Sequence, residues 1–267
     1  MEFLPYILLA LTGILAGSLA GLLGIGGGVV TTPCLVAIFA ILGVDQNEIM
    51  HLAIGTSLAC MILTSSSSTI AHHRKKGVVW SIYPMLGMGI VPGAILGAYI
   101  AKLLPSPTLQ LIFGIFVILV GLNFLRGKHR SEEHAKVRKW WVYLLIGFGV
   151  SSVSALLGIG GGLIMVPLLH LVGLPLRTSV GTAASTGLLI ALVGTVSFLL
   201  FGLNDIADVP GQFGFVYLPA FLIIGILAPI FAPVGAHFAH KLPTQILRRI
   251  FALALIIAGV SLLLTLS

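Results

Sequence analysis

One hexapeptide occurs twice in this chain of 267 residues, once in each half. Residues 23–28 read Leu-Gly-Ile-Gly-Gly-Gly, and residues 157–162 repeat them letter for letter. A proline follows each copy at the same distance, at Pro33 and Pro167. Glycine clusters between apolar stretches are costly in a membrane helix unless bare backbone is needed there. The repetition therefore predicts a duplicated chain with a paired site that is lined by backbone.

The composition is typical of an integral membrane protein. Hydrophobic residues make up 58% of it and charged residues only 8%, whereas soluble domains carry about 25% charged residues. The first segment lacks the basic start of a secretory signal, so we interpret it as a retained span. The net charge of +7 comes from Lys and Arg clusters between apolar runs. This is the positive-inside pattern of membrane proteins rather than a surface for nucleic acid.

Ten apolar segments are expected to form an all-α, polytopic integral membrane protein. They cover residues 3–23, 29–42, 50–71, 78–101, 108–126, 140–157, 163–174, 178–201, 213–239 and 246–266. Most are long enough to cross ~30 Å of hydrocarbon. Segments 29–42 and 163–174 are shorter and directly follow the glycine clusters, so they are predicted to be broken or re-entrant helices.

The charges predict an orientation. Basic residues gather in the linker 127–139, in residues 74–76 and in residues 241–249, and should face the cytoplasm. Acidic residues stand in loops without a cation at Asp45 and Asp208, and these loops should face outward. With ten alternating crossings every Lys and Arg except Lys102 lies inside, and both termini lie outside.

Further matches extend the repeat beyond the hexapeptide. Gly13 pairs with Gly147 at the spacing of the glycine motifs, and Pro105 pairs with Pro243 at a similar spacing. Five segments in each half place the second half upside down relative to the first. We therefore predict a first repeat over 1–126, a basic cytoplasmic linker over 127–139 and an inverted second repeat over 140–267.

The glycine clusters are the first candidates for a substrate site. Each opens a short segment, so it can present free backbone N–H groups at a helix start, where an anion binds readily. The residues expected to line substrate are Gly26, Gly27, Gly28, Gly160, Gly161 and Gly162. The alternative is close helix packing, which small residues also permit.

Grouped hydroxyls are the second candidates. Thr56 and Ser57 follow Gly55 in one segment, and Thr182 and Ser185 follow Gly181 in its counterpart. Neutral O–H donors suit an anion that must also leave. The alternative is that each hydroxyl bonds back to its own helix.

The missing residue types narrow the function further. No Asp or Glu lies within a predicted span, which disfavours a proton pump or a cation carrier and favours an anion or a neutral solute. His51, His170 and His237 are the nearest titratable groups, and they are either packing residues or proton-coupling residues. No enzyme motif, cofactor motif or metal spacing is found.

Three stretches together resemble the TauE/SafE family of membrane permeases. They are residues 23–28 with Pro33, residues 51–58 and residues 71–77, and the second glycine motif fits the same pattern. The resemblance implies a transporter of small sulfur-containing anions, such as sulfite, thiosulfate, sulfoacetate or other sulfonates, in a bacterial (inner) plasma membrane. It implies a site at both glycine loops and at Gly-Thr turns near Thr56, Ser57 and Thr182. Ala183 stands where the first copy has Ser57.

The resulting hypothesis is a secondary transporter with one central anion site and two halves that rock against each other. One alternative is an uncoupled channel for small anions. The other is a membrane-embedded sulfur-handling enzyme, for which Cys34 and Cys60 are the only thiols. The expected partners are the sulfur-containing anion and membrane lipid, and a homo-oligomer is left open. No nucleic acid, cofactor or metal is expected.

Overall fold

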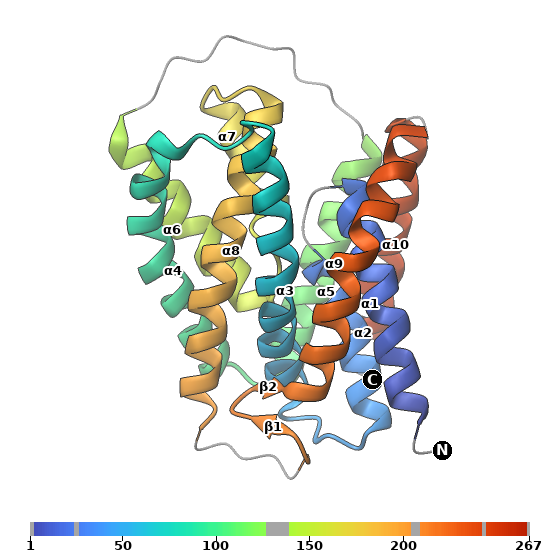
Figure 1. Ribbon diagram of the computed structural model, residues 1–267. Coiled ribbons are helices and arrows are strands. Elements are labelled where there is room, and N and C mark those ends of the chain that lie inside the picture. Colours follow the sequence, from blue (N-terminus) through green and yellow to red (C-terminus); the bar gives the residue numbers. More distant parts are fainter. Residues whose placement is uncertain (1–2, 24–26, 127–138, 204–208, 242–243, 266–267) are drawn as a thin grey trace.

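The computed structural model describes residues 3–23, 27–126, 139–203, 209–241 and 244–265, and these form a bundle of helices (Figure 1). The α-helices are α1 (Leu4–Leu23), α2 (Gly28–Ile41), α3 (Ile49–Arg74), α4 (Tyr83–Leu103), α5 (Ser106–Arg126), α6 (Trp140–Leu157), α7 (Gly162–Leu171), α8 (Leu176–Phe201), α9 (Leu218–Lys241) and α10 (Thr244–Leu264). The prediction of an all-α fold with ten apolar segments is confirmed, because each predicted segment overlaps one helix.

The largest difference from prediction precedes α9. The apolar run from residue 213 does not begin as a helix but as a short antiparallel hairpin of β1 (Gln212–Phe213) and β2 (Val216–Tyr217). Gly211 and Gly214 flank and connect it with φ values of 92° and 53°. Glycine adopts positive φ values without a steric penalty, so the two glycines turn the chain where hydropathy alone predicts a span.

The two helices that follow the glycine motifs are short, as predicted. Helix α2 has 14 residues and α7 has 10. At 1.5 Å per residue they extend over about 21 Å and about 15 Å, so neither crosses ~30 Å of hydrocarbon alone. Gly158 ends α6 in the left-handed conformation at φ 65°, which lets the chain reverse before α7 begins.

The helix contacts repeat between the two halves. Helix α4 packs along α6, and α9 packs along α1, so the fourth helix of each half covers the first helix of the other. Helix α3 packs against α8 and α5 against α10, which pairs equivalent helices of the two halves. A twofold relation between the halves produces this pattern. The division at residues 126 and 140 stays a prediction, and the linker 127–138 lies outside the described residues.

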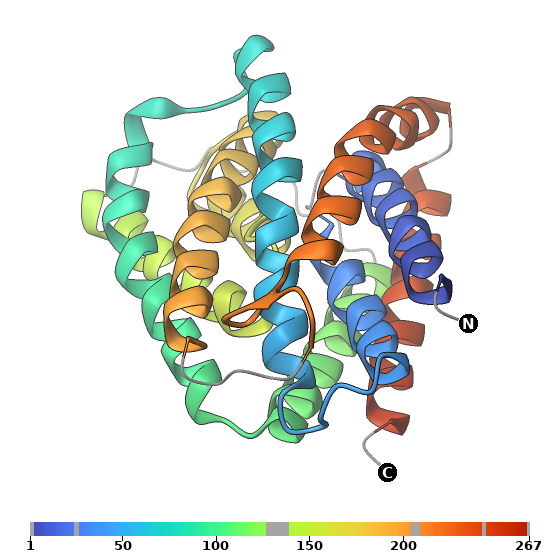
Figure 2. The same ribbon diagram turned by 60° about the horizontal axis from the view of Figure 1, so that its bottom comes forward.

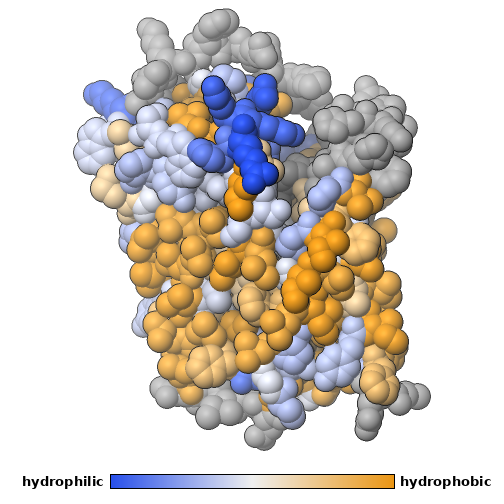
Figure 3. Space-filling view, viewed as in Figure 1, coloured by the Kyte–Doolittle hydropathy of each residue, from blue (hydrophilic) through white to orange (hydrophobic). Residues whose placement is uncertain are grey.

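The two ends of the bundle differ in chemistry. Helix α1 begins and α10 ends at one end, which also carries the hairpin, whereas α5 ends and α6 begins at the other (Figure 1). Hydrophilic side chains gather where α3 joins α4, above a broad hydrophobic band (Figure 3). Arg74, Lys75 and Lys76 are exposed in that connection. Five described helices (α3, α4, α5, α6 and α8) are long and apolar enough to cross a membrane, so the chain is a multi-pass membrane protein.

Candidate functional site

The two glycine motifs meet in the interior of the bundle. A Cβ atom on Gly28, the first residue of α2, would lie 2.7 Å from the carbonyl oxygen of Gly158 and 3.3 Å from the amide nitrogen of Gly160. All three residues are buried. The start of α2 therefore touches the bare backbone between α6 and α7, and only a glycine leaves room for this contact.

Two hydroxyls tie this contact together. Ser57 of α3 donates its hydroxyl to the carbonyl oxygen of Gly158 at 3.0 Å and lies 3.4 Å from that of Gly28. Thr32 of α2 donates to the carbonyl oxygen of Gly28 at 3.0 Å and lies 3.4 Å from that of Gly158. Met61 also packs against Gly28, since its sulfur would lie 2.6 Å from a Cβ atom placed on that glycine. In this structure the hydroxyl protons of Ser57 and Thr32 are thus directed at backbone carbonyls.

Thr56 and Thr182 make equivalent contacts at opposite ends of the bundle. The hydroxyl oxygen of Thr56 accepts a hydrogen bond from the backbone N–H of Tyr217 at 2.9 Å. The hydroxyl oxygen of Thr182 accepts one from the backbone N–H of Val79 at 3.0 Å. Each bond joins the third helix of one half to the segment that precedes the fourth helix of the other half. We name the first contact the hairpin clamp and the second the basic-loop clamp.

The glycine before each threonine lets the clamped segment come close. A Cβ on Gly55 would collide with the carbonyl oxygen of Phe215, and a Cβ on Gly181 would collide with that of Gly77. Both Gly-Thr pairs lie inside long helices, α3 and α8, so the turns implied by the family resemblance are not present. The Gly-Thr pair combines a gap for one carbonyl with an acceptor for an N–H two residues further along. Figure 2 shows the hairpin crossing α3.

The second break has different neighbours. Gly161 is the N-cap of α7, and a Cβ on it would lie 2.6 Å from Cδ1 of Ile190 and 3.9 Å from Oγ of Ser154. The hydroxyl of Ser154 is buried and has no hydrogen-bond partner among the described residues. Ser185 lies further toward the start of α8 and donates its hydroxyl to the carbonyl oxygen of Thr182 at 2.8 Å.

The histidines predicted as proton-coupling candidates are held by backbone carbonyls. Nε2 of His51 lies 3.0 Å from the carbonyl oxygen of Ala101, and the ring stacks on Phe215 at a centroid distance of 5.2 Å. Nδ1 of His170 lies 3.0 Å from the carbonyl oxygen of Leu174 and closes the turn after α7. The side chain of His237 lies outside the described residues. Proton coupling through any of the three stays a prediction.

The remaining predicted glycines divide into described and undescribed positions. Gly27 is buried against Ala16 of α1, and Gly162 is buried as the first residue of α7. Gly26 lies outside the described residues. Sequence reasoning missed Gly158, Thr32, Met61 and Ser154. Gly158 could have been found from the sequence, since it is the first glycine of the repeated hexapeptide. It was not predicted to line the site because only the glycines at the start of the following helix were considered.

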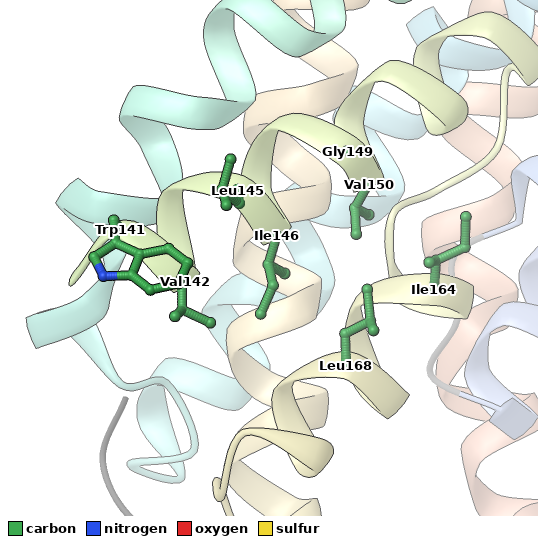
Figure 4. Close-up of a pocket in the computed structure, with 8 residues that line it drawn as sticks. All are labelled: Trp141, Val142, Leu145, Ile146, Gly149, Val150, Ile164 and Leu168. Atoms are coloured by element: carbon green, nitrogen blue, oxygen red, sulfur yellow. The ribbon is translucent and has the colours of Figure 1, made fainter. Parts of the chain in front are cut away.

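A pocket on the side of the bundle differs from this interior contact. It lies between α6 and α7 and has a volume of about 310 Å³ (Figure 4). Its lining is Trp141, Val142, Leu145, Ile146, Gly149, Val150, Ile164 and Leu168. These side chains offer almost no hydrogen-bond donors, so the pocket does not suit an anion. Within the described residues no three His, Cys, Asp or Glu side chains lie close enough to hold a metal ion.

The structure is thus a multi-pass helical bundle in which the starts of two short helices lie close together in the interior. The chain belongs to the sulfite exporter TauE/SafE family, whose family model matches residues 9–262. It is 32% identical to a probable membrane transporter protein of Haemophilus influenzae, over 97% of this chain and 98% of the relative.

It is 30% identical to the probable membrane transporter protein YunE of Bacillus subtilis, over 97% of this chain and 98% of the relative. A relative from Methanocaldococcus jannaschii with the same description is 28% identical over 98% of this chain and 97% of its own length. No solved structure matches the chain.

Proposed function

We propose that the protein is a secondary transporter that moves a small sulfur-containing anion, such as sulfite, thiosulfate or a sulfonate, by alternating access. Its membrane is the bacterial inner membrane, with both termini outside. The family description names sulfite export, and the exposed Arg74–Lys76 connection lies at the end of the bundle opposite to the start of α1. The positive-inside rule places that connection in the cytoplasm.

The observation that carries the proposal is the meeting of two helix breaks in an interior without charged side chains. The buried polar side chains of the described residues are hydroxyls, His51 and Gln110, with no Asp, Glu, Lys or Arg among them. A bare anion in hydrocarbon faces a cost of order tens of kcal/mol. Helix starts with free N–H groups offset this cost by replacing water, and they hold the anion less tightly than a salt bridge would.

The two clamps provide gates for alternating access. The hairpin clamp fastens the segment before α9 to α3, and the basic-loop clamp fastens the segment before α4 to α8. Both hydrogen bonds are present in this structure. In the proposed cycle one clamp opens at a time, so the halves rock and expose the central breaks to each side in turn.

The experiment is flux of ³⁵S-labelled sulfite and thiosulfate in liposomes that contain the full chain. A transporter is expected to show saturable uptake that is accelerated by unlabelled anion on the opposite side of the membrane. Protein-free liposomes and liposomes with heat-inactivated protein are the controls. Absence of flux for every sulfur-containing anion, in protein that is folded and incorporated, would overturn the proposal.

The same experiment separates the alternatives. An uncoupled channel would conduct without acceleration by anion on the opposite side and without dependence on a proton gradient. A sulfur-handling enzyme would change the labelled compound chemically, which chromatography of the recovered label detects. Unmodified label that accumulates inside the vesicles supports transport over both.

A further inference from the structure

We propose that the start of α7 and the hydroxyl of Ser154 together form the subsite that binds the oxyanion, and that the second half of the molecule therefore provides the tighter contacts to substrate. This inference rests on the proposed function. It assigns a binding role to Ser154, which lies on α6. It also means that the two glycine motifs contribute different donors to the site, although their sequences are identical.

Ser154 departs from the behaviour of its neighbours. A serine inside a membrane helix ordinarily bonds back to a carbonyl of the preceding turn, and both Ser151 and Ser152 donate to the carbonyl oxygen of Phe148, at 3.2 Å and 2.8 Å. Ser154 has no exposed surface, and its Oγ has no partner among the described residues. Because an unsatisfied buried hydroxyl is costly, its presence indicates a partner that binds there for part of the cycle.

The hydroxyl of Ser154 faces the first turn of α7. A Cβ on Gly161, the N-cap of that helix, would lie 3.9 Å from Ser154 Oγ. Gly161 and Gly162 carry no side chain that could cap the helix, and no acidic residue stands in its first turn. The N–H groups of Leu163 and Ile164 donate to the carbonyl oxygens of Gly160 and Gly161 at 3.5 Å and 3.2 Å, whereas those of Gly161 and Gly162 have no acceptor among the described residues. The start of a helix also carries a partial positive charge. The hydroxyl of Ser154 and the unpaired N–H groups of Gly161 and Gly162 therefore lie at the same helix start.

The other buried hydroxyls near the breaks are occupied. Ser57 and Thr32 donate to the carbonyl oxygens of Gly158 and Gly28, and Ser185 donates to that of Thr182. At the start of α2 the residue equivalent to Ser154, counted from the repeated glycine motif, is Ala20, which has no hydroxyl. Ser154 is thus the one hydroxyl beside the described break residues whose proton remains available to an anion.

The geometry also indicates the class of ligand and how it enters. Neutral donors from a helix start and one hydroxyl suit a small tetrahedral or pyramidal oxyanion, because three oxygens can each accept a hydrogen bond. The space beside Gly161 is covered by the end of the Ile190 side chain, whose Cδ1 would lie 2.6 Å from a Cβ there. A rotation of this flexible side chain opens the subsite without moving backbone.

The experiment compares Ser154→Ala with Ser151→Ala in the full chain reconstituted into liposomes, with ³⁵S-sulfite as the probe. Both serines lie on α6 and both are fully buried, so Ser151→Ala controls for loss of a buried hydroxyl. Loss of one hydrogen bond to a charged ligand is expected to raise the half-saturating sulfite concentration about ten-fold in Ser154→Ala, the change that ~1.4 kcal/mol produces. Ser151→Ala is expected to leave it unchanged.

A second measurement separates binding from a structural role. Ser154→Ala removes an unsatisfied group, so its thermal stability without ligand should equal or exceed that of the natural protein, while stabilisation by added sulfite should be lost. Sulfite uptake by Ser154→Ala with unchanged half-saturation would overturn the subsite and leave the proposed function intact. Absence of uptake in the natural protein would instead overturn the proposed function, and the subsite with it.

Discussion

The two glycine breaks have the same six letters and different surroundings. At the start of α2, the hydroxyls of Ser57 and Thr32 and the sulfur of Met61 close around Gly28. Counted from each Gly-Thr pair or glycine motif, Ala183 and Val166 stand at the positions of Ser57 and Thr32 in the second half. There an apolar side chain, Ile190, and the unpartnered hydroxyl of Ser154 lie beside the start of α7 instead.

This difference indicates that the two copies of the glycine motif have different roles in the protein. The first break acts as a fixed joint, because its donors and acceptors satisfy one another. At the second break the hydroxyl of Ser154 has no partner among the described residues, and the proposed subsite uses it as a donor to the anion. On this proposal, the residues around the repeated motif, rather than the motif itself, determine which copy contacts the substrate.

The largest expected effect comes from filling the fixed joint. Gly28→Ala places a methyl group 2.7 Å from the carbonyl oxygen of Gly158 and 2.6 Å from the sulfur of Met61. Overpacking of this kind destabilises a protein by about 1–3 kcal/mol, and more where backbone must move. We expect a clear fall in the melting temperature of the purified protein in detergent. Gly149→Ala is the matched control, because nothing lies within 4 Å of its added methyl group, and equal melting temperatures for the two variants would contradict a tight joint.

The next effect distinguishes the two clamps. Thr56→Val removes the acceptor for the N–H of Tyr217, and Thr182→Val removes the acceptor for the N–H of Val79. The bond to Tyr217 is buried and the bond to Val79 is partly buried. An unpaired N–H that is fully buried costs about 1–3 kcal/mol, so Thr56→Val should have the larger effect, and each change should open one side only. Hydrogen exchange followed by mass spectrometry is expected to speed up in the hairpin for Thr56→Val and in the segment before α4 for Thr182→Val.

Conservative variants test whether the threonine oxygens are responsible. Thr56→Ser and Thr182→Ser keep the acceptor and should restore slow exchange. Faster exchange at both ends in each valine variant would show general loosening of the bundle, and the account of two separate gates would then be wrong.

A smaller effect is expected from Ser57→Ala. Its hydroxyl donates to the carbonyl oxygen of Gly158 at 3.0 Å, and a single hydrogen bond contributes about 0.5–1.5 kcal/mol. We expect a modest fall in melting temperature with little change in the half-saturating sulfite concentration, since the first break is a joint. Ser66→Ala serves as the control, because Ser66 bonds back to its own helix at Ile62. A rise in half-saturation as large as that of Ser154→Ala would move the binding role to the first half.

The smallest effect is expected at the cysteines. Cys34 and Cys60 are free thiols within helices α2 and α3, and neither belongs to the contact between the breaks. Replacing both with alanine should leave sulfite flux within about two-fold of the natural protein, because volume changes of this size in a core are tolerated with small losses. Loss of flux in a variant that folds and inserts would favour the sulfur-handling enzyme.

Particular residues show how far sequence reasoning reached. Composition, hydropathy and the repeated hexapeptide predicted the helices, the two short ones among them, because apolar length and glycine breaks are local properties. The hairpin before α9 was missed, since Gly211 and Gly214 interrupt a run that hydropathy counts as continuous. Thr56 and Thr182 were singled out as substrate-binding residues, and that role stays a prediction. The structure shows their hydroxyls bonded to Tyr217 and Val79 of the opposite half, and such long-range contacts leave no trace in spacing.

The most direct measurement of the central claim is sulfite flux in Gly161→Ala, compared with Gly149→Ala at equal protein incorporation. Gly161 has φ −51° and ψ −18°, which alanine adopts without strain, so the added methyl group should cover the start of α7 without unfolding it. The account predicts that Gly161→Ala loses most of the flux and that Gly149→Ala retains it. Undiminished flux in Gly161→Ala, with the protein folded and inserted, would contradict an anion held by the start of α7.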